Sequence, residues 1–322
     1  MAKTTVGRCL RQHEITQEQA SEAFHLRCQA RGLSPNTWVW YSELLKYWRR
    51  FLEDQGVRLP KDVTPHIIRL YLEQLRSRNI CANSRARTYG GLRCIFSFLV
   101  REGMLPQNPF LLVEKPRMEK KLLKPMSLDH VRKLLAAINT KRWTDQNLRT
   151  AIILLMDTGL RVSELIGLRK DQLDFPAGVL RVMGKGGKER EVPFGVAAKQ
   201  ALLSYAARRG EVPGQDLFFV NRYGRKLCRY WIEKALRNLG RAAEVQGVRV
   251  SPHTLRHTFA TQYIKNGGDA FSLQKILGHS TLDMVRVYVG LADADVAALH
   301  RKFSPMDRMG LVPGGKRRVV VQ

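Results

Sequence analysis

The stretch Ser251-Pro-His-Thr-Leu-Arg-His-Thr-Phe-Ala260 carries the clearest local signals in this chain of 322 residues. Serine followed by proline is typical of a helix start, because serine caps free backbone N–H groups and proline fits the first turn. His253 then lies in that turn, and Arg256 lies three residues later on the same face. Helix N-termini attract anions, and the planar guanidinium matches two phosphate oxygens. The stretch therefore predicts a helix whose first turn faces an anion.

A second copy of this spacing shows how little the pair proves alone. Thr64-Pro-His66 is followed by Arg69 inside an ordinary amphipathic helix, where such side chains are usually incidental surface charges. The weight of the first pair therefore depends on its companions. Downstream, Leu277-Gly-His279-Ser places a histidine after a glycine that is expected to end a helix, and Tyr288 follows nine residues later. Alone, these two would be a capping histidine and a packed tyrosine.

Two further candidates lie upstream. Arg161 follows Gly-Leu directly and precedes Glu164 by three residues, which predicts a cation held by its own carboxylate, or an ordinary salt bridge at a helix start. Lys185 lies in the glycine-rich turn Gly184-Lys-Gly-Gly-Lys188. Glycines allow the backbone to approach a sugar-phosphate closely, although a solvated turn lysine has the same pattern.

The charge of the chain indicates a polyanionic partner. It contains 55 Lys+Arg against 28 Asp+Glu, a formal net charge of +27. Residues 1–114 hold 17 basic and 10 acidic residues, and residues 115–322 hold 38 and 18. Such an excess favours binding to nucleic acids, because Lys and Arg release counterions from the phosphates. Both parts are therefore expected to lie against the same nucleic acid, although a generic basic protein would share this charge.

The cysteines and apolar runs indicate an intracellular protein. The cysteines are Cys9, Cys28, Cys81, Cys94 and Cys228. Their wide spacing without any Cys-x-x-Cys favours neither a disulfide framework nor a zinc site, and fits a reducing cytoplasm. The N-terminal residues lack an apolar signal segment, and the apolar run at residues 151–156 is too short to span a membrane. We expect a cytoplasmic protein without a membrane partner.

The first part of the chain predicts a helical domain over residues 1–113. Apolar residues recur at three- and four-residue steps in segments that end at glycine or begin at a capping residue followed by proline. These segments cover residues 16–31, 34–56, 64–75 and 83–102. The residues expected to face inward are Trp38, Tyr41, Leu45, Trp48, Leu52, Ile67, Ile68, Tyr71, Leu72, Leu75, Leu92, Ile95, Phe96 and Leu99.

The second part predicts a mainly α domain with a small β-hairpin. Residues 114–125 are charged and carry prolines at both ends, which indicates an interdomain linker or an ordinary surface loop. Residues 126–305 then form the second domain, and residues 306–322 a basic tail. Strands are expected at 178–183 and 189–193, joined by the turn 184–188. Helices are expected near 127–139, 146–157, 195–209, 228–243, 252–266, 271–277 and 281–290.

Together these motifs resemble the tyrosine recombinase (phage integrase) family, close to its Xer-like site-specific recombinases. The resemblance covers nearly the whole chain. Its motifs are Thr158-Gly-Leu-Arg-Val-Ser-Glu-Leu165, Gly184-Lys-Gly-Gly-Lys-Glu-Arg190, His253-Thr-Leu-Arg-His-Thr-Phe-Ala260 and Leu277-Gly-His-Ser280. It implies a helical, SAM-like core-binding domain that clamps DNA, followed by a tyrosine recombinase catalytic domain. It also implies that a helix at residues 293–300 docks on a neighbouring protomer.

The resemblance assigns a role to each candidate. The family's catalytic positions fall on Arg161, Lys185, His253, Arg256, His279 and Tyr288. The implied reaction is attack of Tyr288 on a phosphodiester, which leaves a 3′-phosphotyrosyl link and a free 5′-hydroxyl. The arginines would hold the phosphate oxygens, His253 would act as the base or orient the phosphate, and Lys185 would be the acid. No cofactor or metal is expected, and the implied partners are double-stranded DNA recombination sites in a homotetramer.

Several functions stay open at this point. Strong basicity and the long tail favour an integrase of a mobile element, and the alternative is Xer-type resolution of chromosome or plasmid dimers. A type IB topoisomerase-like enzyme would use similar chemistry to relax DNA, but the helical N-terminal part and the tail beyond Tyr288 favour a recombinase. A non-catalytic DNA-binding protein is the least favoured, because all six catalytic positions are intact.

Overall fold

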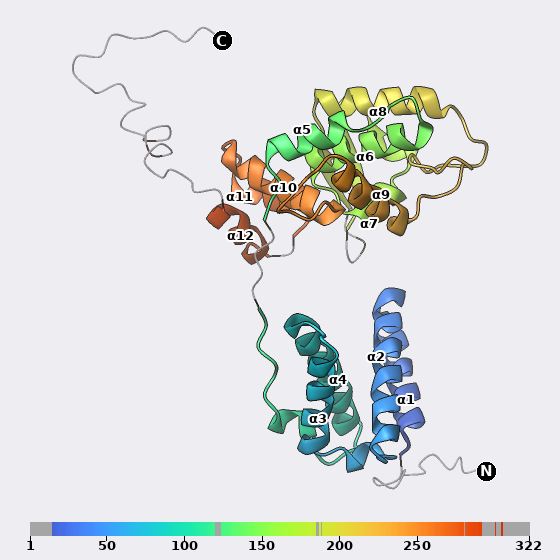
Figure 1. Cartoon of the computed structure of the whole chain (residues 1–322). Helices are drawn as coiled ribbons and strands as arrows, with labels where there is room; N and C mark the ends of the chain where they lie inside the picture. The colour runs from blue at the N-terminus through green and yellow to red at the C-terminus, as the bar shows by residue number, and fades with distance from the viewer. Residues whose placement is uncertain are drawn as a thin grey trace. The chain divides into compact units, whose positions relative to one another are not determined.

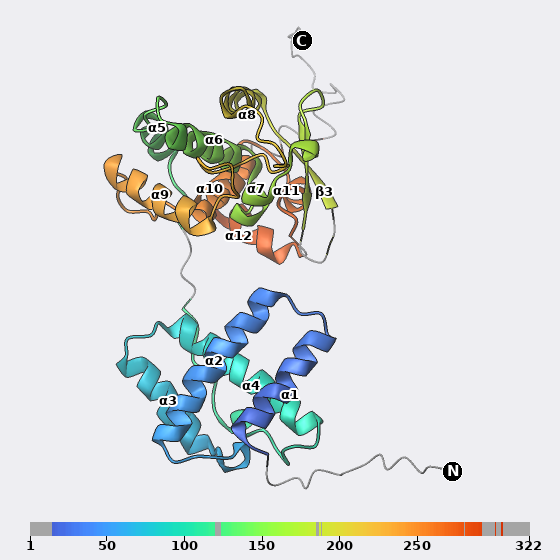
Figure 2. The same ribbon diagram turned by 90° about the vertical axis from the view of Figure 1, so that its right-hand side faces the viewer.

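The computed structural model describes residues 15–119, 124–184, 187, 189–279, 281–291, 300 and 304. The chain divides into two units, Met1–Lys121 and Leu122–Gln322, and each has its own apolar core. Helices dominate both units, and a small sheet belongs to the second (Figure 1, Figure 2). The predicted fold class, mainly α with a small β-sheet, is confirmed.

The N-terminal unit is built from four helices. They are α1 (Gln17–Ala30), α2 (Pro35–Asp54), α3 (Pro65–Ser77) and α4 (Ala82–Arg101). The short 3-10 helix η1 (Pro60–Asp62) lies between α2 and α3, and η2 (Pro109–Leu112) follows α4. The first three begin where the capping residues predict, since the side chains of Thr16, Ser34 and Thr64 each accept a hydrogen bond from a backbone N–H three residues later.

Aromatic side chains fill the core of this unit. Trp48 is fully buried and packs against Phe96 and Phe110, with ring centroids 6.4 and 6.1 Å away. Gly91 allows α2 to approach α4, because a Cβ atom at this position would lie 2.5 Å from atoms of the Trp40 side chain. Nine of the fourteen residues expected to face inward are buried, and the other five are only half-buried: Trp38, Tyr41, Ile67, Leu72 and Leu75.

The C-terminal unit carries the sheet and most of the helices. Its helices are α5 (Leu128–Ala136), α6 (Trp143–Thr158), α7 (Val162–Gly167), η3 (Lys170–Gln172), α8 (Val196–Arg209), α9 (Arg229–Ala242), α10 (Pro252–Lys265), α11 (Ala270–Leu277) and α12 (Asp283–Leu291). Its strands are β1 (Leu173–Asp174), β2 (Val179–Met183) and β3 (Glu189–Pro193). Helix α6 lies in the middle of the unit and packs against both α8 and α10 (Figure 2).

The sheet is antiparallel in the order β1-β2-β3. The predicted hairpin is present, with Val179 opposite Pro193 and Met183 opposite Glu189. Strand β1 and helix α7 were not predicted. They have two and six residues, and elements this short do not complete the periodic pattern on which a sequence-based assignment depends.

Some predictions fall outside the described residues. Lys185, the tail at 306–322 and all but the last residue of the expected helix at 293–300 belong to this group. In the part of the chain that the structure describes, no helix has the length and apolar character needed to cross a membrane.

Candidate active site

The end of α6 places Arg161. Gly159 ends that helix in the left-handed conformation (φ 62°), where a Cβ atom would lie 2.4 Å from the Phe259 ring. Arg161 then stands at the N-cap of α7. Its Nη1 and its backbone N–H each donate to the Glu164 carboxylate at 2.8 Å, and its Nη2 donates to Gly278 O at 3.2 Å. The predicted pairing of this arginine with the glutamate is confirmed, and the same carboxylate caps the helix.

The first turn of α10 places His253. Ser251 Oγ accepts a hydrogen bond from the Thr254 N–H at 3.2 Å, and Pro252 occupies the first helical position, as predicted. Partial burial lowers the pKa of His253 below 6.5, and the positive charge of Arg256 lowers it further. The side chain is exposed overall, so solvent limits this shift. His253 is therefore neutral at pH 7 and able to accept a proton.

Arg256 lies one turn deeper and is only 5% exposed. Its Nη1 donates to Gly159 O at 2.6 Å, and its Nη2 donates to Leu277 O at 2.8 Å and to His279 Nε2 at 2.9 Å. Burial lowers the pKa of Arg256 to about 10, and the charge of Arg161 adds to this effect. The guanidinium thus remains charged at neutral pH, and two helix ends fix its position.

His279 follows Gly278, which ends α11 in the left-handed conformation (φ 63°). Because arginine can only donate, His279 Nε2 accepts the bond from Arg256, and the proton of the neutral ring is assigned to Nδ1. Burial lowers the pKa of His279 to about 4, with further lowering by Arg256, so the ring is neutral at pH 7. Nδ1 is buried and has no hydrogen-bond partner among the described residues. A buried donor of this kind is suited to an incoming acceptor.

Tyr288 lies on α12 and is 6% exposed. Its ring centroid is 5.0 Å from that of His257 and 6.4 Å from that of His279, and it packs into a small apolar cluster with Val285. Burial raises the pKa of the Tyr288 hydroxyl, and the charge of Arg256 opposes this rise. The phenol therefore lies within the electrostatic reach of the buried guanidinium.

The predicted residues thus fall into three groups. The structure brings Arg161, Arg256 and His279 together around the end of α11, and places Tyr288 beside the last of these. His253, in the first turn of α10, is exposed to solvent. Lys185 lies outside the described residues, and only its flanking strands, β2 and β3, are placed.

Arg190 belongs to this cluster but was assigned no role from the sequence. Its Nη1 and Nη2 each donate to the Glu164 carboxylate at 2.9 Å. Burial raises the pKa of Glu164, but the hydrogen bonds from Arg190 and Arg161 outweigh it, and the pKa lies below its ordinary value. Strand alternation could have revealed Arg190, because side chains two residues apart share a face and Val192 is fully buried.

The charges of the cluster suit an anion. Arg161, Arg190 and Arg256 bring three positive charges, and Glu164 brings one negative charge, which leaves a local excess of two positive charges among these residues. A phosphodiester carries one negative charge and gains a second as a nucleophile adds to it, so the excess matches the transition state. Within the described residues, no group of three or more His, Cys, Asp or Glu side chains is arranged to hold a metal ion.

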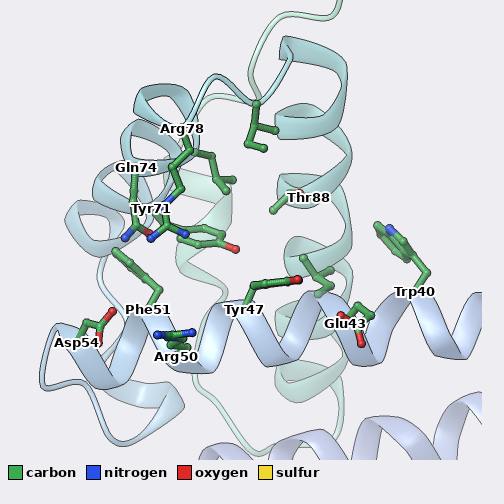
Figure 3. A pocket seen from close by; sticks show the side chains of 13 residues that line it. Trp40, Glu43, Tyr47, Arg50, Phe51, Asp54, Tyr71, Gln74, Arg78 and Thr88 are labelled. Atoms are coloured by element: carbon green, nitrogen blue, oxygen red, sulfur yellow. The ribbon is translucent and has the colours of Figure 1, made fainter.

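A separate hollow of about 650 Å³ lies in the N-terminal unit, between α2, α3 and the start of α4 (Figure 3). Figure 3 shows Tyr47 and Phe51 on α2, Gln74 on α3 and Arg78 directly after α3, around this space. Burial raises the pKa of Tyr71, which also lines it, to about 12, so this phenol stays protonated. None of the six predicted catalytic residues lines the hollow, and the chemistry of the molecule is not placed there.

Two family models match the chain. The model described as the phage integrase family matches residues 124–295, and the model described as the phage integrase N-terminal SAM-like domain matches residues 24–103. The first spans the positions of all six predicted catalytic residues, and the second covers most of the N-terminal helical unit.

Curated relatives match over most of their length. The tyrosine recombinase XerD of Halalkalibacterium halodurans is 32% identical over 297 residues, which cover 91% of this chain and 99% of that protein. XerD of Pseudomonas aeruginosa is 34% identical over 85% of this chain and 93% of that protein. The tyrosine recombinase XerC of Listeria monocytogenes is 32% identical over the same shares.

Solved structures share the fold. Lambda integrase, as a dimer bound to a COC′ core site, matches with a TM-score of 0.71 and 21% identity, over 85% of this chain and 95% of that chain. The Tn1549 transposon integrase, in complex with a circular intermediate DNA, matches with a TM-score of 0.71 and 21% identity, over 92% of this chain and all of that chain. With the family models and the curated relatives, these matches establish that the chain belongs to the phage integrase family and is a tyrosine recombinase.

Proposed function

We propose that this protein is a site-specific DNA recombinase that cleaves and rejoins double-stranded DNA through a 3′-phosphotyrosyl intermediate, with Tyr288 as the nucleophile. The observation that carries the proposal is the position of Arg256. Its buried guanidinium is held by Gly159 O, Leu277 O and His279 Nε2, and its charge acts on the neighbouring phenol. A phosphate seated on this arginine would lie within the same cluster as the nucleophile.

The arginines are proposed to clamp the scissile phosphate. Arg161 and Arg256 offer guanidiniums whose positions are fixed by Glu164 and by backbone carbonyls, so little reorganisation is needed when charge develops. The Nδ1–H of His279, which has no partner among the described residues, would donate a further hydrogen bond to a non-bridging oxygen. Together they stabilise the second negative charge that forms during the attack.

Activation of the tyrosine is the main energetic requirement. A free phenol has a pKa of about 10, so ionising it near pH 7 costs roughly 4 kcal/mol. Burial raises the pKa of Tyr288 further, whereas Arg256 lowers it. His253, neutral at pH 7, is proposed to take the phenolic proton as Tyr288 Oη attacks the phosphorus.

The leaving group completes the reaction. The bond from phosphorus to the 5′-oxygen breaks as the bond to Tyr288 Oη forms, and Lys185 is proposed to give a proton to the departing oxygen. Attack of a 5′-hydroxyl on the phosphotyrosyl ester reverses these steps. Because the ester conserves the energy of the phosphodiester bond, rejoining to another strand needs neither ATP nor a bound cofactor.

The wider assembly is proposed from the same framework. Residues 1–113 would clamp the DNA, residues 114–125 would link to the catalytic domain at 126–305, and residues 306–322 would form a tail. Four copies would act together at paired recombination sites. The fold is shared with a lambda integrase tetramer bound to a Holliday junction, with a TM-score of 0.69 and 21% identity, which supports this arrangement.

Two biological roles fit the proposed chemistry. The net charge of +27 favours integration of a mobile element, whereas the curated relatives, named XerC and XerD, favour Xer-type dimer resolution. Footprinting of the protein on its own genomic DNA would separate the roles, because the protected site would lie either at the boundary of a mobile element or in a chromosomal or plasmid resolution site.

The test uses a nicked suicide substrate, which traps the covalent protein–DNA adduct. Tyr288→Phe is expected to abolish the adduct and to leave DNA binding intact. Tyr263→Phe is the matched control, since Tyr263 lies on α10 and bonds to Ser272 Oγ at 2.9 Å, and this variant should retain adduct formation. Adducts that persist in Tyr288→Phe would refute the assignment of the nucleophile.

A further inference from the structure

Arg190 lies on β3, in the second residue pair from the turn of the hairpin, opposite Val182 of β2. Its side chain is 12% exposed and points toward α7 and the end of α11, two elements that carry residues of the proposed active site. The hairpin therefore contributes a largely buried arginine to the cluster.

All three guanidinium nitrogens of Arg190 donate a hydrogen bond. Nη1 and Nη2 donate to the two oxygens of Glu164, both at 2.9 Å, and Nε donates to Ile276 O at 2.9 Å. The side chain also packs on Gly278, where an added Cβ atom would lie 3.0 Å from Arg190 Nε. One planar group thus ties three separate segments of the catalytic unit together.

These segments are the ones that hold the phosphate clamp. Glu164 accepts hydrogen bonds from Arg190, and it also accepts one from Arg161 Nη1 at 2.8 Å. At the end of α11, three successive carbonyls accept from three different arginines. The pairs are Ile276 O with Arg190, Leu277 O with Arg256 and Gly278 O with Arg161. The last carbonyls of a helix lack partners within the helix and carry its negative dipole end, so they suit cations.

We propose that Arg190 is a positioning residue for DNA cleavage: it fixes Glu164 and the end of α11, and through them sets the positions of Arg161 and His279. The inference rests on the proposed function, since it assigns Arg190 to that same site. It assigns Arg190 contacts within the protein, to Glu164 and Ile276 O, and no contact with the DNA.

The geometry requires arginine at this position. Only a planar fork can donate to both oxygens of a carboxylate and to a carbonyl at once, whereas an ammonium group offers the charge without the fork. Arg181, on the adjacent strand, is the matched contrast. Among the described residues it pairs with Glu191 alone, at 3.4 Å, and both of these side chains are more than half exposed.

Single-turnover cleavage of a suicide substrate at saturating protein is the first test. Arg190→Gln and Arg190→Lys are both expected to lower the cleavage rate constant by roughly 100-fold, as a misplacement of about 1 Å does, with DNA affinity within threefold of the wild type. Arg181→Gln should stay within twofold. A rate constant unchanged in Arg190→Lys, or a loss confined to the fraction of active protein, would overturn the proposal.

A double variant tests whether Arg190 acts through Glu164. If it does, the cleavage rate constant of the double variant Glu164→Gln/Arg190→Gln should lie within about threefold of that of the slower single variant, because the effects of residues in one network do not add. Rate losses that multiply would show independent roles and would contradict the proposal.

A readout without cleavage keeps this inference separate from the proposed function. In the DNA-free wild type, nitrogen NMR of the His279 imidazole should report a single tautomer with the proton on Nδ1. Arg190→Lys, which retains the charge, should mix the tautomers or shift both ring nitrogens, whereas Arg181→Gln should not. Unchanged His279 resonances in Arg190→Lys would overturn the positioning role, even if the wild type formed no adduct and the proposed function failed.

Discussion

Helices α3 and α10 begin with the same sequence pattern, but their first turns lie in different environments. Thr64-Pro-His66 with Arg69 and Ser251-Pro-His253 with Arg256 share the cap, the proline, the histidine and the arginine at matching positions. In both, the cap side chain accepts from a backbone N–H three residues later. The arginines differ: Arg69 is exposed and donates to Leu112 O at 3.3 Å, whereas Arg256 is buried and makes three bonds.

The difference lies in what each helix packs against. The first turns of α10 meet the left-handed end of α6 and the end of α11, both of which present free backbone carbonyls. Arg69 on the corresponding face of α3 reaches one such carbonyl, Leu112 O at the end of η2, and both Arg69 and His66 stay exposed. The same short motif thus gives a buried arginine with a fixed position only where the tertiary fold supplies several acceptors for it.

Among variants that retain Tyr288, the largest effect is expected from removing the buried arginine. Arg256→Ala should lower the single-turnover cleavage rate by roughly 10²–10³-fold, because a preorganised donor to the developing charge is lost. DNA affinity should fall much less. Arg69→Ala, at the matching position of α3, should leave the cleavage rate at saturating protein within about twofold. Equal losses of cleavage rate in the two variants would contradict the proposed role of Arg256 in holding the scissile phosphate.

A smaller effect is expected from the histidines, and it should depend on pH. His253→Gln should lower the cleavage rate by about 100-fold, the lower range for a general base. The lowered pKa of His253 keeps the ring neutral and competent above its titration, so the wild-type rate should fall only as pH drops below 6.5. His279, with a pKa of about 4, remains neutral throughout that range.

The pH–rate profiles of two histidine variants test whether His253 is the titrating group. His253→Gln should lose the acid limb, whereas His66→Gln should keep both the limb and the rate. A wild-type acid limb with its midpoint above pH 6.5, or one that persists in His253→Gln, would contradict the role of His253 as the base.

The sequence predicts most of the helices for a reason visible at their ends. At Thr64 and Ser251 the cap and the proline act locally, and the helices begin there in the structure. The pairing of Arg161 with Glu164 was also predictable, because its partners are three residues apart. Helix α7 and strand β1 were missed, since six and two residues carry too little periodicity.

The part of the site that could not be predicted depends on contacts between distant segments. Arg190 reaches Glu164 across 26 residues and Ile276 across 86. Nothing in the local sequence of β3 identifies those partners, because they are set by how the hairpin packs on α7 and α11. The environment of Arg256 has the same origin, since its acceptor Gly159 O lies 97 residues away.

The smallest effect is expected from the glycine that supplies this acceptor. Gly159→Ala should lower the free energy of unfolding by about 2–3 kcal/mol, because alanine is strained at φ 62° and its Cβ would overlap Phe259. Gly32 is the matched control: it has φ 60°, but no atom lies within 4 Å of an added Cβ, so Gly32→Ala should cost only about 1 kcal/mol. Denaturant unfolding measures both. The cleavage rate of the folded protein should fall in Gly159→Ala alone, since only this glycine positions the acceptor of Arg256. Equal stability losses would show that backbone strain, and not the close packing around this acceptor, accounts for the cost.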